Sequence, residues 1–328
     1  MKKLALFLAF LMLVAITSRA AENNIVTIVY NGSTASVTVS DSVSEYVTVS
    51  SGTSSNVVIV QKNTAAINND EITYILSGTS DAGSFKLTGS YKCTISLAGL
   101  TLNNSSGPAL TIINGKRIKL SAKKETTNTL TAKSNATYNG AIYCKGHLEL
   151  QGNGVLNISD SYAHGIKAKE YIQVKNITLN IISAVKDGIN CDEFFWMKSG
   201  EVNISGVGSD GIEVGLSGMV STGEIAATES ADAHEDEDSG NFYQDGGTLT
   251  ISLANGSVGE AISASGKEVH NGGTYNGTNY DTAVKGVSES VSCDSSSEVY
   301  DLSGRKAQGS KRGIRIIKNS RSTKLVVK

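Results

Sequence analysis

The feature that most constrains the fold is a repeat of about 23 residues, each copy starting at a small residue followed by isoleucine. Four consecutive copies open at Ala141, Gly165, Gly188 and Gly211, which lie 24, 23 and 23 residues apart. A repeat of this length is the sequence signature of a solenoid, in which one unit buries its apolar face only against its neighbours. The repeat therefore predicts stacked coils.

Three apolar positions recur in every copy, and they predict three inward-facing columns. The columns are Ile142, Ile166, Ile189, Ile212 and Ile262, then Leu148, Ile172 and Phe195, then Ile158, Ile181, Ile204 and Ile251. This pattern indicates an all-β chain folded as a right-handed parallel β-helix with three short strands per coil, in which column neighbours lie about 4.8 Å apart. The alternative, a β-sandwich of hairpins, leaves the fixed period unexplained.

The rest of the chain divides around this repeat. Residues 1–20 are predicted to be a secretory signal peptide, because two lysines precede an apolar run that is too short to span a bilayer. Alternating strands in 21–70 predict an N-terminal β cap element, since an open solenoid end would expose core and strand edges. The β-helix should span 71–284, followed by a Ser-rich linker and a basic segment in 285–328.

Charge is distributed unevenly along the chain. The signal peptide holds three of the 29 basic residues, and residues 298–328 hold nine with two acids, so the part between carries a net charge of −12. An acidic body argues against nucleic-acid binding, which needs a basic surface, and is compatible with cation binding. The basic C-terminal segment is expected to serve surface attachment or secretion.

The column pattern also predicts structural roles for cysteine and asparagine. Cys144 and Cys191 fall two coils apart, too far for a disulfide, so these two and Cys93 should be small core residues, whereas Cys293 lies in the tail. No Cys/His spacing typical of zinc sites occurs. An outward column of amides and a hydroxyl is expected to stabilise the stack by side-chain hydrogen bonds: Asn157, Asn180, Asn203 and Thr250.

Several motifs in order carry a resemblance to a known family. ITYILSGTS, GSFKLTGSYKCTISLAGLTL, VKDGIN, SGEVNISGVGSDGIEV and GGTLTIS, within residues 24–284, resemble a family of secreted bacterial carbohydrate-binding β-helix proteins with a polysaccharide-lyase-like fold. The resemblance implies binding of acidic plant polysaccharides such as polygalacturonate, and calcium. The segment VYDLSGRK…RGIRIIK…KLVVK is similar to the C-terminal sorting segment of secreted Bacteroidetes proteins, although Arg315 departs from the usual pattern.

The candidate calcium site is the twice-occurring Asp-Gly-Ile. Asp187 and Asp210 occupy equivalent turns, so their carboxylates should lie about 5 Å apart, which matches two oxygens on opposite sides of Ca²⁺. Glu213, Asn190 and Asp192 share the same outward surface and could add oxygen ligands. The alternative is that Asp before Gly only makes the turn. His164 holds the same turn position one coil earlier, and because it is no hard-cation ligand, the site should not extend to that coil.

The expected glycan contacts lie near this site. Trp196 and Tyr243 should be outward neighbours that either stack on sugar rings or cover a flank of the fold, and Glu260 continues the acidic turn column. The acidic insertion 224–240 is either a solvated loop or a second cation site or lid.

Three function classes follow. We favour a non-catalytic, calcium-dependent polysaccharide-binding protein. A calcium-dependent polysaccharide lyase would need a general base, for which Lys167, Lys169 and Lys186 are the candidates, although neighbouring carboxylates favour the charged ammonium. The third class is a structural β-helix or surface adhesin that binds no sugar.

Overall fold

The computed structural model describes residues 24–63, 71–133, 137–216, 238–278, 298–300, 314–318 and 323–327. The predicted signal peptide, the Ser-rich linker with Cys293, and residues 217–237, which include most of the acidic insertion, lie outside the described residues. The chain divides into two compact units, Met1–Tyr280 and Asp281–Lys328.

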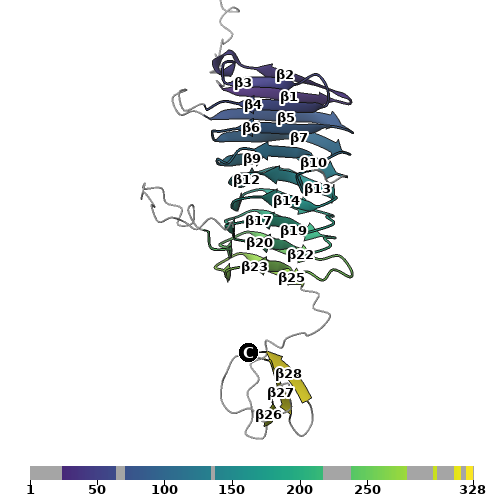
Figure 1. Ribbon diagram of the computed structural model, residues 1–328, viewed down its shortest axis with the longest axis vertical. Coiled ribbons are helices and arrows are strands. Elements are labelled where there is room, and N and C mark those ends of the chain that lie inside the picture. The colour runs from purple at the N-terminus through teal and green to yellow at the C-terminus, as the bar shows by residue number, and fades with distance from the viewer. Residues whose placement is uncertain are drawn as a thin grey trace, which may run out of the picture. The chain divides into compact units, whose positions relative to one another are not determined.

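The first unit is a stack of parallel coils, which Figure 1 shows as successive layers from purple to green. One side of the stack, here called the nine-stranded face, begins with β3 (Val47–Ser51), which pairs antiparallel with the next strand. The parallel strands of this face are, in order along the stack, β4 (Asn56–Gln61), β6 (Ser84–Gly89), β8 (Leu110–Ile113), β11 (Gly140–Cys144), β14 (His164–Ala168), β17 (Ile189–Cys191), β20 (Ile212–Val214) and β23 (Ile262–Ala264).

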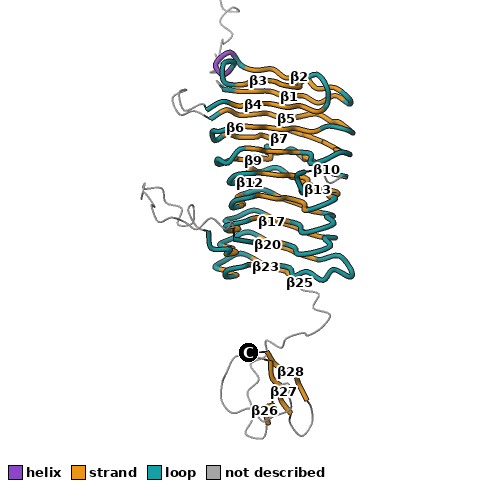
Figure 2. Tube along the Cα trace, viewed as in Figure 1, coloured by secondary structure: helices purple, strands orange, loops and turns teal. Residues whose placement is uncertain are grey.

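A 16-stranded sheet supplies the other two sides of the stack. The second face consists of β9 (Ile118–Ala122), β12 (Leu148–Gly152), β15 (Ile172–Lys175), β18 (Phe194–Met197), β21 (Asn241–Gln244) and β24 (Glu268–His270). The third face consists of β10 (Thr127–Ala132), β13 (Val155–Ser161), β16 (Thr178–Ile181), β19 (Glu201–Ser205), β22 (Thr248–Ser252) and β25 (Thr274–Thr278). Loops join the faces, as the teal segments between the orange strands show (Figure 2).

Two long strands run through both the second and the third face. They are β5 (Ile72–Ser80) and β7 (Cys93–Asn104), and the first half of β7 pairs with β9 while its second half pairs with β10. The chain bends between the halves at Gly78 and Gly99, whose φ angles of +86° and +81° lie in the left-handed region that favours glycine. These bends are why one sheet can form two sides.

The predicted three-column core is confirmed. Ile142, Ile166, Ile189, Ile212 and Ile262 are successive register partners on the nine-stranded face. The columns led by Leu148 and by Ile158 are also in register. Nearly all these side chains have no exposed surface, and full burial of such a side chain contributes about 1.5–3 kcal/mol. The stack therefore shares one continuous core.

The N-terminal strands contain both a cap and coil-like strands. In the part that the sequence predicts to be a cap, β1 (Ile25–Asn31) already pairs parallel with β5, and β4 pairs parallel with β6. Two strands of this part pair antiparallel: β2 (Thr34–Val39) with β1, and β3 with β4. A short 3-10 helix, η1 (Asp41–Val43), lies between β2 and β3 in the sequence. Parallel stacking thus begins at β1.

The asparagine and cysteine predictions are confirmed for the described residues. Asn180 Nδ2 donates to Asn157 Oδ1 at 2.8 Å, and Asn203 Nδ2 donates to Asn180 Oδ1 at 3.0 Å. Cys93, Cys144 and Cys191 are free and fully buried, and this burial raises the pKa of each thiol.

The second unit contains a three-stranded antiparallel sheet formed by β26 (Glu298–Tyr300), β27 (Ile314–Lys318) and β28 (Thr323–Val327). Within the described part of the chain, no helix has the length and apolarity needed to cross a membrane.

Candidate functional site

The two Asp-Gly-Ile turns lead from the third face into the nine-stranded face in adjacent coils. The Gly188 amide donates to the Asp210 carbonyl at 3.0 Å, so one turn rests on the next. A Cβ on Gly188 would lie 2.6 Å from Ile204 Cγ2 and 2.7 Å from the Gly211 carbonyl oxygen. Close packing therefore requires glycine at this position and fixes where the preceding aspartate side chain leaves the backbone.

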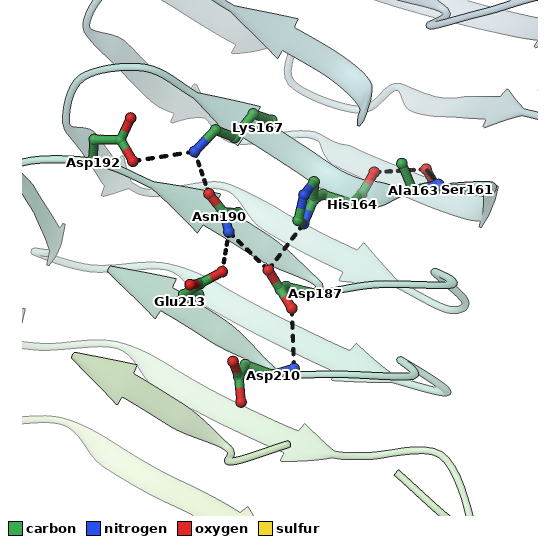
Figure 3. Close-up of polar contacts among 9 residues, drawn as sticks. All are labelled: Ser161, Ala163, His164, Lys167, Asp187, Asn190, Asp192, Asp210 and Glu213. Atoms are coloured by element: carbon green, nitrogen blue, oxygen red, sulfur yellow. Dashed lines mark hydrogen bonds and ion pairs between the residues drawn. The ribbon is translucent and has the colours of Figure 1, made fainter. Parts of the chain in front are cut away.

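Asp187, Asp210 and Glu213 form a carboxylate cluster at this edge of the nine-stranded face (Figure 3). One oxygen from each carboxylate lies within 4.8 Å of the others. Asp187 is only 3% exposed, whereas the other two are half-buried. The predicted proximity of the two aspartates and Glu213 is thus present, and two of the three acids keep part of their surface exposed.

Each aspartate side chain also accepts a hydrogen bond from the backbone of the turn in the next coil. Asp187 Oδ1 accepts a hydrogen bond from the Asp210 amide at 3.2 Å, and Asp210 Oδ1 accepts one from the Glu260 amide at 2.6 Å. Both aspartates therefore do stabilise turns, which was one of the two roles that the sequence allows for them. Among the described residues no backbone amide donates to the Glu213 carboxylate, so turn formation does not explain this third acid.

Asn190 and His164 complete the surroundings of Asp187. Asn190 Nδ2 donates to Asp187 Oδ2 at 2.8 Å and to Glu213 Oε2, while its Oδ1 accepts from Lys167 Nζ. His164 Nδ1 lies 2.9 Å from Asp187 Oδ2, and this histidine is 7% exposed. The polar network therefore does reach the His164 coil, although through a nitrogen contact and not an oxygen ligand. The sequence indicates this contact, because His164 holds the same turn position as Asp187 one coil earlier.

The cluster holds more negative charge than its surroundings readily accommodate. Burial alone would raise the pKa of Asp187, but contacts with His164, Glu213 and Asn190 hold it well below its usual range. The contact with ionised Asp187, together with burial, raises the pKa of Glu213 to about 7. Burial and the charge of Asp187 also raise the pKa of Asp210. A proton on Glu213 thus relieves the repulsion when no cation is bound.

Asp192, a predicted ligand, lies outside the group of Asp187, Asp210 and Glu213. Its Oδ1 lies 3.2 Å from Lys167 Nζ and its Oδ2 lies 3.0 Å from Lys169 Nζ, so both oxygens face ammonium groups. The Lys169–Asp192 neighbourhood follows the predicted column. Lys186 is exposed in the turn before Asp187, and Glu260 is exposed beside Asp210.

Trp196 and Tyr243 are register partners, as the alignment of coils predicts. The indole is only 8% exposed, however, and packs in a satellite apolar cluster with Tyr171, Phe194 and the partly buried Tyr243. Its Nε1 donates to Asp245 Oδ2 at 2.7 Å. The observed burial fits a side chain that covers the flank of the fold better than one that presents a stacking platform.

The donor set of the cluster fits a hard cation. Ca²⁺ takes six to eight oxygen ligands at about 2.3–2.6 Å, so ligands on opposite sides lie about 5 Å apart. One carboxylate oxygen from each of Asp187, Asp210 and Glu213 lies within 4.8 Å of the others, close enough for all three to contact one ion. Rotation of the Asn190 amide would turn Oδ1 toward the same space. The three residues of the cluster offer only carboxylate oxygens and no sulfur or imidazole, which favours a hard cation over zinc.

Two comparisons place the chain among known proteins. A family model described as carbohydrate-binding domain-containing protein matches residues 61–319. The solved structure of the polysaccharide lyase-like protein from C. thermocellum, in its gadolinium derivative, is similar with a TM-score of 0.54 and 18% sequence identity, over 76% of this chain and 93% of that chain. At this identity the likeness concerns the fold. The curated proteins include no match.

Proposed function

Because the chain belongs to the carbohydrate-binding domain-containing protein family, we propose that it is a secreted, non-catalytic protein that binds acidic polysaccharides through a calcium ion. The observation that carries the proposal is the cluster of Asp187, Asp210 and Glu213, whose oxygens lie within 4.8 Å of one another. Three acids gathered on the outward side of a rigid β-helix serve no apolar packing. They supply a preformed cradle for a hard cation.

The electrostatics of the cluster support a bound cation. Glu213 has its pKa raised to about 7 because it lies against ionised Asp187, and a divalent ion would compensate both charges at once. The similar C. thermocellum structure is a gadolinium derivative. Lanthanides are hard, oxygen-seeking cations like calcium, which makes them suitable probes of the same donor set here.

A calcium ion in this cradle would give selectivity for acidic sugars. Three carboxylates and one amide oxygen fill only part of a coordination shell of six to eight oxygens. A uronic acid carboxylate would supply the remaining oxygens. Pectin-like glycans such as polygalacturonate carry these carboxylates along the chain, and the acidic body of the protein would repel them unless a cation intervened.

The N-terminal leader supports export, since a charged start is followed by a short apolar run and a small-residue site at Ala20. The basic residues of 298–328 are proposed to attach the protein to the cell surface or to direct its secretion.

Retention on immobilised polygalacturonate tests the proposal. We expect wild-type protein to be retained in calcium and released by EDTA, and Asp187→Asn combined with Asp210→Asn to flow through in both conditions. Asp160→Asn, an exposed acid on β13, is the matched control and should behave as wild type. Retention that survives both EDTA and the double variant would refute calcium-mediated binding.

Polysaccharide lyase activity is the second candidate, and Lys167 is the observation that favours it. This lysine is buried between Asn190 and Asp192, one coil from the carboxylate cluster, where a base would be needed. Its Nζ is held by an ion pair with Asp192 and by a hydrogen bond to Asn190, contacts that suit a structural lysine better than a base poised for proton abstraction. Incubation with polygalacturonate and calcium should produce no ultraviolet absorbance from unsaturated sugar products. A rise that Lys167→Ala abolishes would establish the lyase.

A further inference from the structure

Tyr143 lies on the nine-stranded face in the same outward column as the cation site. Its register partner in the next coil is Lys167, which is followed by Asn190 and then by Glu213. Three coil steps separate Tyr143 from Glu213, a span of about 14 Å at the usual strand spacing. A single straight row of outward positions therefore connects this tyrosine with the carboxylate cluster.

Tyr143 is paired with a second tyrosine. The rings of Tyr138 and Tyr143 have their centroids 4.7 Å apart at an angle of 42°. Both side chains keep part of their surface exposed, unlike Trp196, which is 8% exposed. Such a pair presents partly open aromatic surface at the outside of the sheet, on which the apolar C–H face of a sugar ring can pack.

Three lysines lie on or directly after the strands next to the tyrosine pair. Lys86 Nζ lies 5.9 Å from the centroid of the Tyr138 ring. Lys145 follows the strand of Tyr143, and Lys169 follows the equivalent strand in the next coil. Lys169 is 49% exposed and pairs with Asp192. Among the described residues, neither Lys86 nor Lys145 has a carboxylate within ion-pair distance. Two cations without a carboxylate partner in the described part of the chain provide charge complementarity to a polyanion.

Building on the proposed function, we propose that Tyr138, Tyr143, Lys86, Lys145 and Lys169 form a second, metal-independent subsite for the same acidic polysaccharide. A sugar ring packs on the tyrosines and its carboxylate pairs with a lysine, while a later sugar in the same chain reaches the cation at the carboxylate cluster. The glycan then runs along the stack, across β11, β14, β17 and β20, and not along a strand.

Calorimetry with short and long oligogalacturonates in saturating calcium tests this subsite. A short oligomer reaches only the cation, whereas a long one engages both places. Tyr138→Ala with Tyr143→Ala should weaken binding of the long oligomer about tenfold and leave that of the short oligomer unchanged. Tyr138→Phe with Tyr143→Phe keeps the rings and should bind as wild type. Equal affinity of the alanine variant and wild type for the long oligomer would overturn the subsite.

Control variants separate this subsite from general loss of structure. Tyr91 has Lys92 Nζ 5.9 Å from its ring, the same cation–ring distance as at Tyr138, but lies in the turn before β7. Tyr91→Ala should leave the affinity for the long oligomer unchanged, and equal weakening by it would contradict the subsite. Lys86→Gln with Lys145→Gln, which keeps both tyrosines, should reduce the salt dependence of long-oligomer binding. Wild-type protein that binds neither oligomer in calcium would refute the proposed function itself, whereas wild-type binding that the tyrosine variant leaves intact would refute only this inference.

Discussion

At the scale of single residues, the two oxygens of Asp187 have different partners. Oδ1 accepts the amide of Asp210 and so joins two coils, while Oδ2 faces His164 and Asn190 inside the polar network. One side chain therefore serves the turn and the candidate cation site together. This is why the two interpretations of Asp-Gly-Ile, turn and ligand, are not exclusive.

The raised pKa of Glu213 predicts how stability depends on pH. The folded protein holds this proton up to about pH 7, whereas an ordinary glutamate loses it near 4.5. Protonation of Glu213 thus stabilises the folded state. In EDTA, its contribution to the free energy of unfolding is complete below about pH 4.5 and is lost as pH rises through about 7. Thermal unfolding at several pH values should show the loss, and calcium should restore stability at pH 8 more than at pH 5.

Glu213→Gln is the control for that prediction, because glutamine keeps the shape but cannot titrate. Glu193 also has its pKa raised to about 7, chiefly by burial. It therefore adds the same pH dependence of stability to wild type and to Glu213→Gln. The difference between wild type and variant therefore isolates Glu213. Identical pH profiles in EDTA, or equal calcium stabilisation of both proteins, would contradict this assignment.

Gly188 offers a prediction from packing alone. Alanine there would place its Cβ 2.6 Å from Ile204 Cγ2, so Gly188→Ala should lower the free energy of unfolding by about 1–3 kcal/mol, as overpacking commonly does. Gly115→Ala is the matched control, because no atom lies within 4 Å of the Cβ it would add. Chemical denaturation measures both, and equal stabilities of the two variants would refute the packing explanation.

At the scale of strands, the repeat predicted which residues share a column but not how each side chain uses its neighbours. The isoleucine columns follow directly from the period, because inward residues in a stack have one place to go. Asp192 lies on the same outward surface as the carboxylate cluster, but its two oxygens form ion pairs with Lys167 and Lys169 of the preceding coil. A column pattern gives the neighbours of a residue in its own column, but it does not predict a contact between columns, such as that of Lys167 with Asp192.

The same limit applies to boundaries between elements. Parallel pairing already begins at β1 because its apolar alternation matches that of β5, although no 23-residue repeat marks it. β5 and β7 cross two faces because a single glycine with positive φ makes the bend. Trp196 was expected at the surface from its outward position, but it is covered in the cluster with Tyr171 and Phe194.

The asparagine ladder gives a prediction for the third face. Asn180 both donates to Asn157 and accepts from Asn203, so Asn180→Ala removes two side-chain hydrogen bonds. The expected loss is about 1–2 kcal/mol of unfolding free energy. Gln173→Ala changes a comparable outward amide on β15, for which no hydrogen bond to the described residues is found, and should cost less. A smaller loss for Asn180→Ala than for Gln173→Ala would contradict the role of the ladder.

At the scale of the whole molecule, the stacked coils convert a repeat in sequence into rows of outward side chains along one face. On the nine-stranded face, tyrosines and lysines lie toward the N-terminal coils and the carboxylate cluster lies toward the C-terminal coils. This order suits the long polyanion that we propose as the ligand, which would meet the lysines directly and the acids through a cation. The membership in a carbohydrate-binding family agrees with such a surface.

Calcium titration by calorimetry, with and without a saturating long oligogalacturonate, tests the central claim most directly. If one ion joins the carboxylate cluster to the glycan, the oligomer must tighten calcium binding by the same factor as calcium tightens oligomer binding. We predict tighter calcium binding in the presence of the oligomer for wild type, and loss of both effects in Asp187→Asn with Asp210→Asn. Calcium affinity that is the same with and without the oligomer, or the same in the variant, would contradict the account.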